Sequence, residues 1–480
     1  MEKSLYKNVS IYIIKTVVSI ILPIITFPYI SRTLGVEVYG EVQFVISLVT
    51  YFQLIAGLGI NSYAIREGSK IRDNRDELRK IISEVFVINI ISTFLSYCLM
   101  MCFFMNYEKI RNDSGMFWIY GTCILFTTFS MEWVFNILEE YSYIAKRSIL
   151  FQVISFVILF IVVREQNDNI NYIFVLVFPI LGTAIVNFKT ICNNKLLFHK
   201  GKYELKKHIK PILYVFGINL ASSIYLNLDT TMLGMLKDNY EVGIYSAAIR
   251  ITKQIIVLIN AICSVFLPRI SYYFSNKRWD DYYKTIKTAL NLILMISIPI
   301  SIGILMIGED IILIMCGSEY IAASEVIKIL AIELFFAIVN GFLAWQILMP
   351  WGKEKKIFVF TLLGGITDFF VNLCLIPKMG AMGAAVGTML AEIVVFLLCT
   401  KESRNILKQV RFVKIVKEYV LVSMWIVAIS LLVSCFDISI IPKLIIVIWG
   451  SAFMYFLQLL LNRNTYITEL AVKCKAYLFR

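Results

Sequence analysis

The sequence predicts an all-α integral membrane protein with about fourteen transmembrane helices. Hydrophobic residues make up 59% of the 480 residues and charged residues only 16%, whereas a soluble domain carries about 25% charged residues. Apolar runs of at least ~18 residues recur from end to end and are separated by short polar connections, which is the pattern of membrane-spanning helices. No stretch is long and polar enough for a separate soluble domain.

The first apolar run, 10–31, is predicted to be a retained helix and not a secretory signal peptide. It contains Lys15, Pro23 and Pro28 and leads into Arg32 without a small-residue cleavage site. The remaining predicted spans are 40–62, 79–105, 116–138, 148–163, 171–188, 211–236, 242–272, 285–308, 325–350, 357–377, 383–400, 418–435 and 438–461.

The basic residues predict the orientation, because short loops rich in Lys and Arg stay in the cytoplasm. With the N-terminus inside, the inner segments hold 34 Lys and Arg residues and the outer segments hold seven. Both termini are therefore expected in the cytoplasm. The net charge of +13 is explained by this topology and by anionic lipid headgroups, so a nucleic-acid partner is not expected.

The sequence offers no pattern typical of an enzyme, a metal site or a bound cofactor. The ten cysteines have neither metal-binding nor disulfide spacing, and we interpret them as packing residues. His199 and His208 fall in one predicted basic loop without a catalytic triad pattern, and no phosphate-binding loop for ATP is present. Whatever drives the activity of the protein would then be an ion gradient, the membrane potential or the substrate gradient.

A loose internal repeat predicts the domain organisation. Ser-Arg-Thr-Leu-Gly at 31–35 with Tyr-Gly at 39–40 is echoed by Thr-Met-Leu-Gly at 231–234 with Val-Gly-Ile-Tyr at 242–245. Six predicted helices separate the two copies, so the repeat indicates a duplicated bundle. The expected domains are a six-helix bundle at 1–208, a second at 209–400, and helices 13 and 14 with a cytoplasmic tail at 401–480.

The same motifs carry a family resemblance that spans about residues 1–400. The matching segments are Phe-Pro-Tyr-Ile-Ser-Arg-Thr-Leu-Gly at 27–35, Gly-Leu-Gly-Ile-Asn-Ser-Tyr-Ala-Ile-Arg-Glu at 57–67, Tyr-Leu-Asn-Leu-Asp-Thr-Thr-Met-Leu-Gly at 225–234, Val-Gly-Ile-Tyr-Ser-Ala-Ala at 242–248, Leu-Pro-Arg-Ile-Ser at 267–271 and Ile-Pro-Lys-Met-Gly-Ala-Met-Gly-Ala-Ala at 376–385. They resemble the Wzx-type oligosaccharide flippases of the multidrug/oligosaccharidyl-lipid/polysaccharide exporter superfamily.

The resemblance implies two pseudo-symmetric six-helix bundles around a central cavity that opens alternately to either side of a bacterial plasma membrane. It also implies that the cargo is an undecaprenyl-diphosphate-linked oligosaccharide repeat unit carried outward. Helices 13 and 14 are less diagnostic.

Ionisable residues inside the predicted spans are the candidates for cargo binding and coupling. A charge at the bilayer centre costs about 2.5 kcal/mol or more on insertion scales, so such residues should face a cavity or a partner. The candidates are Lys15, Glu132, Asp229, Arg250, Lys253, Glu333, Asp368 and Glu392. For each of them, an interhelical pair or a snorkelling side chain is the alternative interpretation, and Lys15 and Glu132 fit snorkelling best.

The predicted eighth helix is the most informative. One of its faces carries polar side chains at Ser246, Arg250, Lys253, Asn260 and Ser264. Asp229 on the preceding helix and Arg250 should lie at equal depth, roughly 12 Å below the outer surface, so a salt bridge between them is permitted. We expect a cationic cavity formed by Arg250, Lys253, Lys15 and Arg32 to bind the cargo diphosphate. Asp229, Glu333, Asp368 and Glu392 are assigned coupling or charge-pairing roles.

Three functions compete at this point. The oligosaccharide flippase is favoured by the motifs. A drug or ion antiporter, or a flippase for a peptidoglycan precursor, has the same architecture. A membrane glycosyltransferase or polymerase is disfavoured because the outer loops are short. Membrane lipids are expected partners, while coupled protons or sodium ions and a polysaccharide polymerase partner stay open.

Overall fold

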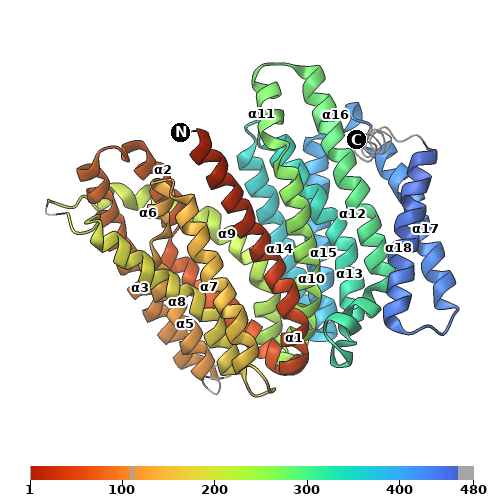
Figure 1. The fold of residues 1–480 in the computed structure, drawn as a ribbon, viewed down its shortest axis with the longest axis horizontal. Coiled ribbons are helices and arrows are strands. Elements are labelled where there is room, and N and C mark those ends of the chain that lie inside the picture. Colours follow the sequence, from red (N-terminus) through yellow and green to blue (C-terminus); the bar gives the residue numbers. More distant parts are fainter. Residues whose placement is uncertain (1, 109–110, 112–113, 200, 463–480) are drawn as a thin grey trace. The chain divides into compact units, whose positions relative to one another are not determined.

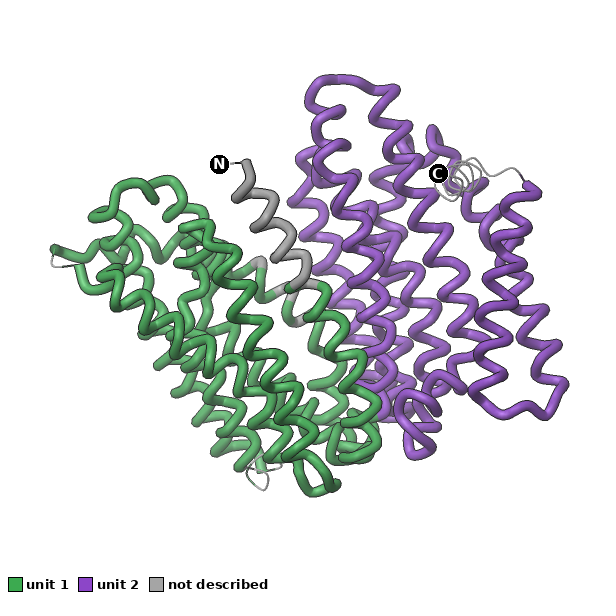
Figure 2. Tube along the Cα trace, viewed as in Figure 1, with its two compact units in different colours: residues 1–243 green, residues 244–480 purple. Residues whose placement is uncertain are grey.

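The computed structural model describes residues 2–108, 111, 114–199 and 201–462, and the predicted cytoplasmic tail lies outside them. The described residues form two compact units, 1–243 and 244–480 (Figures 1 and 2). The predicted repeat boundary after residue 208 is a different kind of division, drawn from sequence similarity, and stays a prediction.

Almost the whole described chain is helical. Unit 1 contains α1 (Glu2–Gly57), α2 (Ile60–Gly68), η1 (Ser69–Ile71), α3 (Arg75–Asn106), α5 (Ser114–Ser130), α6 (Glu132–Ile137), α7 (Tyr141–Val162), α8 (Asn169–Asn193), α9 (Lys206–Leu236) and the start of α10 (Asn239–Ser264). Unit 2 continues with α11 (Leu267–Ser275), α12 (Trp279–Met315), η2 (Ser318–Tyr320), α13 (Ala323–Phe342), η3 (Leu343–Leu348), α14 (Glu354–Met379), α15 (Ala381–Glu402), α16 (Arg404–Gln409), α17 (Phe412–Ser434) and α18 (Ile440–Leu461).

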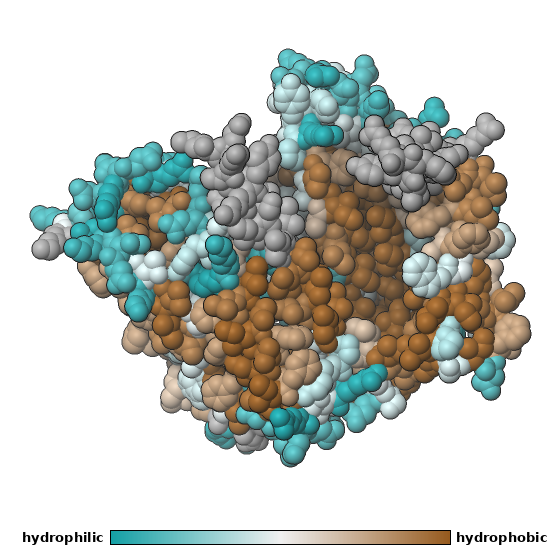
Figure 3. All heavy atoms as spheres, in the orientation of Figure 1, coloured by the Kyte–Doolittle hydropathy of each residue, from teal (hydrophilic) through white to brown (hydrophobic). Residues whose placement is uncertain are grey.

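The membrane prediction is confirmed. Among the described residues, eleven helices are long and apolar enough to cross a membrane. Apolar side chains cover the middle of the helices, and hydrophilic side chains gather at the helix ends (Figure 3). The chain is a multi-pass membrane protein.

Each of the fourteen predicted spans is helical in the structure, although several are divided. Helix α1 holds the first span and residues 40–57 of the second, which ends in α2, and Gly35 with φ of 73° divides α1 into two helical segments. The span predicted at 116–138 is divided into α5 and α6 at Met131, and the one at 242–272 is divided into α10 and α11. Apolar content alone does not reveal such breaks, because the residues at them are themselves apolar.

Helix ends in the polar connections are held by local hydrogen bonds. The Asn74 Oδ1 accepts from the Glu77 N–H at the start of α3. Before α8, the Asp168 carboxylate accepts from the Arg164 and Glu165 N–H groups, at 2.8 and 2.9 Å. These backbone donors hold the pKa of the Asp168 carboxyl below its usual range.

Glycines of the repeated motif lie at a close approach within unit 1. A Cβ on Gly243 would meet the Val36 carbonyl oxygen, and a Cβ on Gly40 would meet the Asn239 carbonyl oxygen. The first motif copy therefore packs directly on the second, with backbone against backbone. Only a residue without a side chain permits this distance, as at other small-residue contacts between membrane helices.

Unit 2 is centred on α12, which packs against α13, α17 and α18. The Tyr419 hydroxyl on α17 donates to the Asn291 Oδ1 at 3.2 Å, and the Tyr455 hydroxyl on α18 donates to the Met295 carbonyl at 2.9 Å. The Lys443 Nζ lies 2.7 Å from the Asp310 Oδ2. Helices α17 and α18 correspond to the predicted helices 13 and 14. They are thus fixed to the rest of unit 2 by polar contacts as well as by apolar packing.

Candidate functional site

A polar cavity of about 540 Å³ lies inside unit 1. Seven helices contribute to it, namely α1, α2, α3, α5, α6, α7 and α8. Eleven of its sixteen lining residues are polar, although the helices that carry them are apolar. The amides are Gln53, Asn61, Asn89, Asn136 and Gln152, the hydroxyls are Thr127, Thr128, Ser130, Ser148 and Thr183, and the one ionisable residue is Glu132. The volume falls within the range of roughly 300–1,000 Å³ that is typical of small-ligand sites.

Helix breaks create the room for this cavity. Between α1 and α2, Leu58 and Gly59 have positive φ of 41° and 73°, and between α5 and α6 Met131 has φ of 42°. Helix α8 carries Pro179 in its interior, and this residue lines the cavity. Interrupted helices at membrane depth are tolerated where the backbone is buried in protein or lines a water-filled cavity.

Side chains of neighbouring helices bind the carbonyl groups near these breaks. The Ala56 carbonyl accepts from the Asn89 Nδ2 at 2.9 Å and from the Ser92 hydroxyl at 2.5 Å. The Ser130 carbonyl accepts from the Asn187 Nδ2 at 2.6 Å. The breaks are thus stabilised by polar residues on α3 and α8, which fixes the shape of the cavity.

Glu132 anchors an ionic network at the edge of the cavity. Its carboxylate lies 3.7 Å from the Lys15 Nζ and 3.1 Å from the Arg147 Nη2. Arg147 is buried, also donates to the Asn187 Oδ1, and lies 5.4 Å from the centre of the Tyr143 ring. Lys15 was predicted to help bind an anionic cargo, and its position beside Glu132 also fits the alternative of an interhelical pair.

His208 corrects one expectation. We expected it in a basic loop with no carboxylate arrangement, but it is buried in α9 with its Nε2 2.8 Å from the Glu84 Oε2. Its Nδ1 lies 2.5 Å from the Tyr63 hydroxyl. Both ring nitrogens of His208 therefore have a hydrogen-bond partner. The cluster joins α2, α3 and α9, which explains why a histidine is buried here.

Lys207 and Lys80 lie at the solvent-exposed edge of this cluster. The Lys207 Nζ lies 3.5 Å from the Glu84 Oε2 and 3.2 Å from the Glu204 Oε2, and the Lys80 Nζ lies 3.4 Å from the Glu204 Oε1. The hydrogen bonds from Lys207 and then Lys80 lower the pKa of the Glu204 carboxyl.

The residues predicted to bind the cargo, and the predicted pairing residue Asp229, are distributed over both units. Arg250 and Lys253 lie on α10 in unit 2, where Arg250 is half-buried and Lys253 is exposed. Arg32 is exposed on α1 and Asp229 is buried on α9, both in unit 1. The pairing of Asp229 with Arg250 would join the two units, and it stays a prediction.

Three of the predicted coupling residues are buried in unit 2: Glu333 on α13, Asp368 on α14 and Glu392 on α15. The Asn340 Nδ2 donates to the Glu392 Oε2 at 2.5 Å, and the Asn372 Nδ2 donates to the Asp368 Oδ1 at 3.1 Å.

Gly387 of α15 faces two of these groups, because a Cβ there would come within 2.9 Å of the Asp368 Oδ1 and also meet the Asn372 Oδ1. The structure therefore places Asp368 and Asn372 directly against the backbone of α15.

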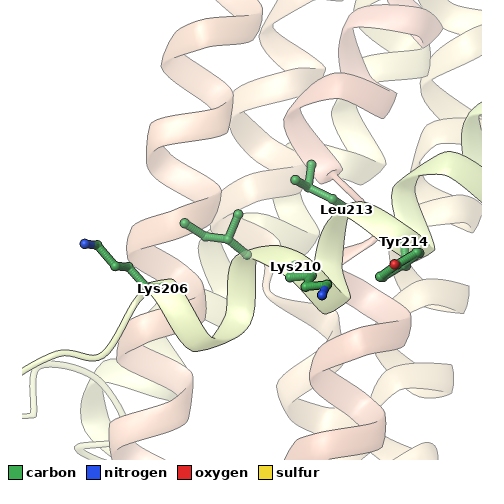
Figure 4. Close-up of a pocket in the computed structure, with 5 residues that line it drawn as sticks. Lys206, Lys210, Leu213 and Tyr214 are labelled. Carbon is green, nitrogen blue, oxygen red and sulfur yellow. The ribbon is translucent and has the colours of Figure 1, made fainter.

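A second pocket, of about 470 Å³, lies along the first turns of α9 (Figure 4). It is lined by Lys206, Ile209, Lys210, Leu213 and Tyr214. Ammonium groups beside exposed apolar side chains are typical of a helix at the boundary between lipid headgroups and acyl chains.

Sequence reasoning missed the polar cavity. Single amides and hydroxyls such as Gln53, Thr127 and Gln152 stand alone in apolar runs, where we did not consider them because they carry no charge. Gly59, inside the predicted span 40–62, and Pro179, inside the predicted span 171–188, were the local signals of irregular helix in this region.

Comparison with known proteins shows which family models and relatives match this chain. The family model described as "Polysaccharide biosynthesis protein" matches residues 5–274, and the MatE model matches residues 215–373. A protein named "Putative O-antigen transporter" from Shigella dysenteriae is 22% identical over 404 residues, which cover 82% of this chain and 99% of that protein. A protein of the same name from Escherichia coli strain K12 is 23% identical over 407 residues, which cover 84% of this chain and 97% of that protein.

The fold is similar to that of a solved flippase. A structure titled "Lipid II flippase MurJ, inward closed conformation" matches with a TM-score of 0.73 and 15% identity, covering 95% of this chain and 99% of that chain. At this identity the likeness concerns the fold alone. The family model, in contrast, covers more than half of the chain, from the first helix into α11. The chain therefore belongs to the polysaccharide biosynthesis protein family.

Proposed function

We propose that this protein is a flippase that moves polyprenyl-diphosphate-linked oligosaccharides from the cytoplasmic to the outer leaflet of a bacterial plasma membrane by alternating access. Family membership carries the proposal, together with full-length relatives that are named as O-antigen transporters. The fold, which is similar to that of a solved flippase over 95% of the chain, is compatible with it. Both termini face the cytoplasm in this proposal, following the distribution of Lys and Arg.

The cargo explains why cations are needed in the transport path. A diphosphate that leaves water requires charge-assisted donors, and the guanidinium of Arg250 and the ammonium of Lys253 are suited to it. The two residues are three positions apart on α10 and so share one face. Lys15 and Arg32 on α1 are the further cations assigned to this role.

The membrane potential favours the proposed direction. Moving one negative charge out of a negative interior releases about 2.3 kcal/mol per 100 mV. If bound cations cancel the cargo charge, the same energy is released when the empty cationic cavity returns inward. Asp229, Glu333, Asp368 and Glu392 are proposed to pair with these charges or to couple protons or sodium ions to the cycle.

Deletion of the gene tests the proposal. The deletion strain should lose its surface polysaccharide and accumulate lipid-linked oligosaccharide on the cytoplasmic leaflet, measured by lipid extraction and by accessibility to an added glycosidase. Surface polysaccharide at the wild-type level, in a strain with no second flippase, would refute it. Rescue by a peptidoglycan-precursor flippase, or drug sensitivity without glycan loss, would favour the other members of the superfamily.

A further inference from the structure

We propose that the polar cavity of unit 1 binds the uncharged saccharide portion of the cargo, while Arg250 and Lys253, which do not line this cavity, hold its diphosphate. This inference rests on the proposed flippase function and deepens it by assigning a place to the sugar.

The chemistry of the lining distinguishes a sugar from a phosphate. Amides and hydroxyls each present donors and acceptors, and sugar hydroxyls also donate and accept. An ionised diphosphate only accepts, so it could pair with the donors of this lining but would leave the amide and hydroxyl acceptors unpaired, whereas a saccharide can pair with both. Ten neutral polar side chains around one carboxylate therefore match a saccharide.

The one carboxylate of the lining is neutralised by the protein itself. Glu132 has Lys15 and Arg147 within 4 Å, and the Arg147 guanidinium is further engaged by Asn187. This network sits at the edge of the cavity and leaves the neutral groups to set its binding properties.

Several lining side chains have hydrogen-bonding capacity to spare. Gln53 on α1, Asn61 on α2 and Thr183 on α8 form no side-chain hydrogen bond with the described part of the chain. A polar group left bare at membrane depth is costly, so such groups are expected to meet water or a ligand. Three unengaged side chains from three helices surround one volume and can converge on one ligand.

One aromatic residue completes the match. Trp133 on α6 lines the cavity and is itself buried, so its ring is held in place. The part of this indole that borders the cavity offers an apolar surface to sugar C–H groups, while the amides reach the hydroxyls. A drug-binding site would instead be lined predominantly by apolar and aromatic residues.

Equilibrium binding to the purified full-length chain in lipid nanodiscs tests this assignment with two probes. One is the lipid-linked oligosaccharide extracted from the deletion strain, and the other is a polyprenyl diphosphate of the same chain length without sugar. The wild-type chain should bind the glycosylated lipid at least about tenfold more tightly, because several hydrogen bonds add to the diphosphate contact.

Two variants test whether the preference for the glycosylated lipid arises in the polar cavity. Gln53→Leu and Asn61→Leu should each weaken binding of the glycosylated lipid by about 5- to 30-fold and leave binding of the bare diphosphate lipid unchanged. Gln458→Leu is the matched control, because Gln458 is a half-buried glutamine of α18 in unit 2, outside the cavity lining, and bonds only to nearby Asn462, at 3.3 Å. Unchanged elution on size exclusion shows that each variant is folded.

The outcomes separate the two proposals. Equal affinity of the wild-type chain for both lipids, or equal weakening of both by the variants, would overturn the saccharide site and leave the flippase standing. If neither lipid binds and the deletion strain keeps its surface polysaccharide, both proposals fail. A preference for the glycosylated lipid that both variants reduce and the control keeps supports the assignment.

Discussion

Arg147→Met is expected to destabilise unit 1 strongly, although the residue lies only a few positions from the start of its helix. The substitution leaves the buried Asn187 Oδ1 without its donor, at a cost of about 1–3 kcal/mol. It also removes the contact with the Tyr143 ring, worth about 0.5–1 kcal/mol. The ion pair with Glu132 adds about 0.2–1 kcal/mol, since the Glu132 side chain is 39% exposed and Lys15 remains beside it.

One effect of the substitution stabilises the protein instead. The Arg147 Nε is buried without a hydrogen-bond partner in the described part of the chain, so its removal relieves about 1 kcal/mol. The net loss is then about 1–4 kcal/mol, or a fall of about 2–16 °C in the apparent melting temperature for a unit of this size.

Thermal unfolding of the purified chain, followed with a thiol-reactive dye, measures this loss, and Cys123 is a buried reporter within unit 1. Lys146→Met is the matched control, because the neighbouring Lys146 is exposed and should shift the midpoint by less than about 1 °C. An Arg147→Met midpoint equal to that of the control would refute the energetic reasoning. Glu132→Gln added to Arg147→Met should change the midpoint little further.

Three other predictions follow from the fold and the proposed transport path. Gly243→Val should prevent correct packing, since its side chain would collide with a backbone carbonyl, and fluorescence-detected size exclusion should show loss of the monodisperse peak. Arg250→Gln and Lys253→Gln should each lower glycan export strongly at unchanged protein level, measured as surface polysaccharide per cell. A cysteine replacing Lys202 in a chain without other cysteines should resist an impermeant maleimide in intact cells, because the segment 189–210 is predicted to be cytoplasmic.

For each of these three predictions, a specific result would contradict the reasoning. Gly303 has open space where a Cβ would lie, so Gly303→Val should keep the peak that Gly243→Val loses, and equal behaviour of the two variants would contradict the packing argument. Native export by the double variant Asp229→Asn/Arg250→Gln would mean that Arg250 only pairs with Asp229 and does not hold cargo. Labelling of residue 202 from outside would reverse the topology.

Helix number and class could be predicted from the sequence because the bilayer imposes a length and a composition on every span. Breaks in those spans could not, as Met131 shows: an apolar residue occupies the left-handed region where a propensity argument would place glycine or asparagine. His208 likewise looked like a loop residue, because its partners Glu84 and Tyr63 are more than 120 positions away.

The candidate site divides in the same way. Charged residues such as Asp368 and Glu392 could be singled out because charge is rare and costly in a membrane span, and the structure buries both, while their role stays a prediction. The polar cavity was not found, since an isolated glutamine or threonine barely changes the hydropathy of a span. The cavity is formed by the convergence of seven helices, which no local pattern in the sequence encodes.

The neutrality of the cavity lining has a consequence for how such a protein can diversify. Exchanges among Ser, Thr, Asn and Gln at positions such as Gln53, Asn61 and Thr183 rearrange donors and acceptors without adding a charge to any span. Each exchange therefore avoids the insertion cost of about 2.5–3.5 kcal/mol that a new charge at mid-membrane would bring. The helices can keep folding into the bilayer while the pattern of hydrogen bonds inside them changes one residue at a time.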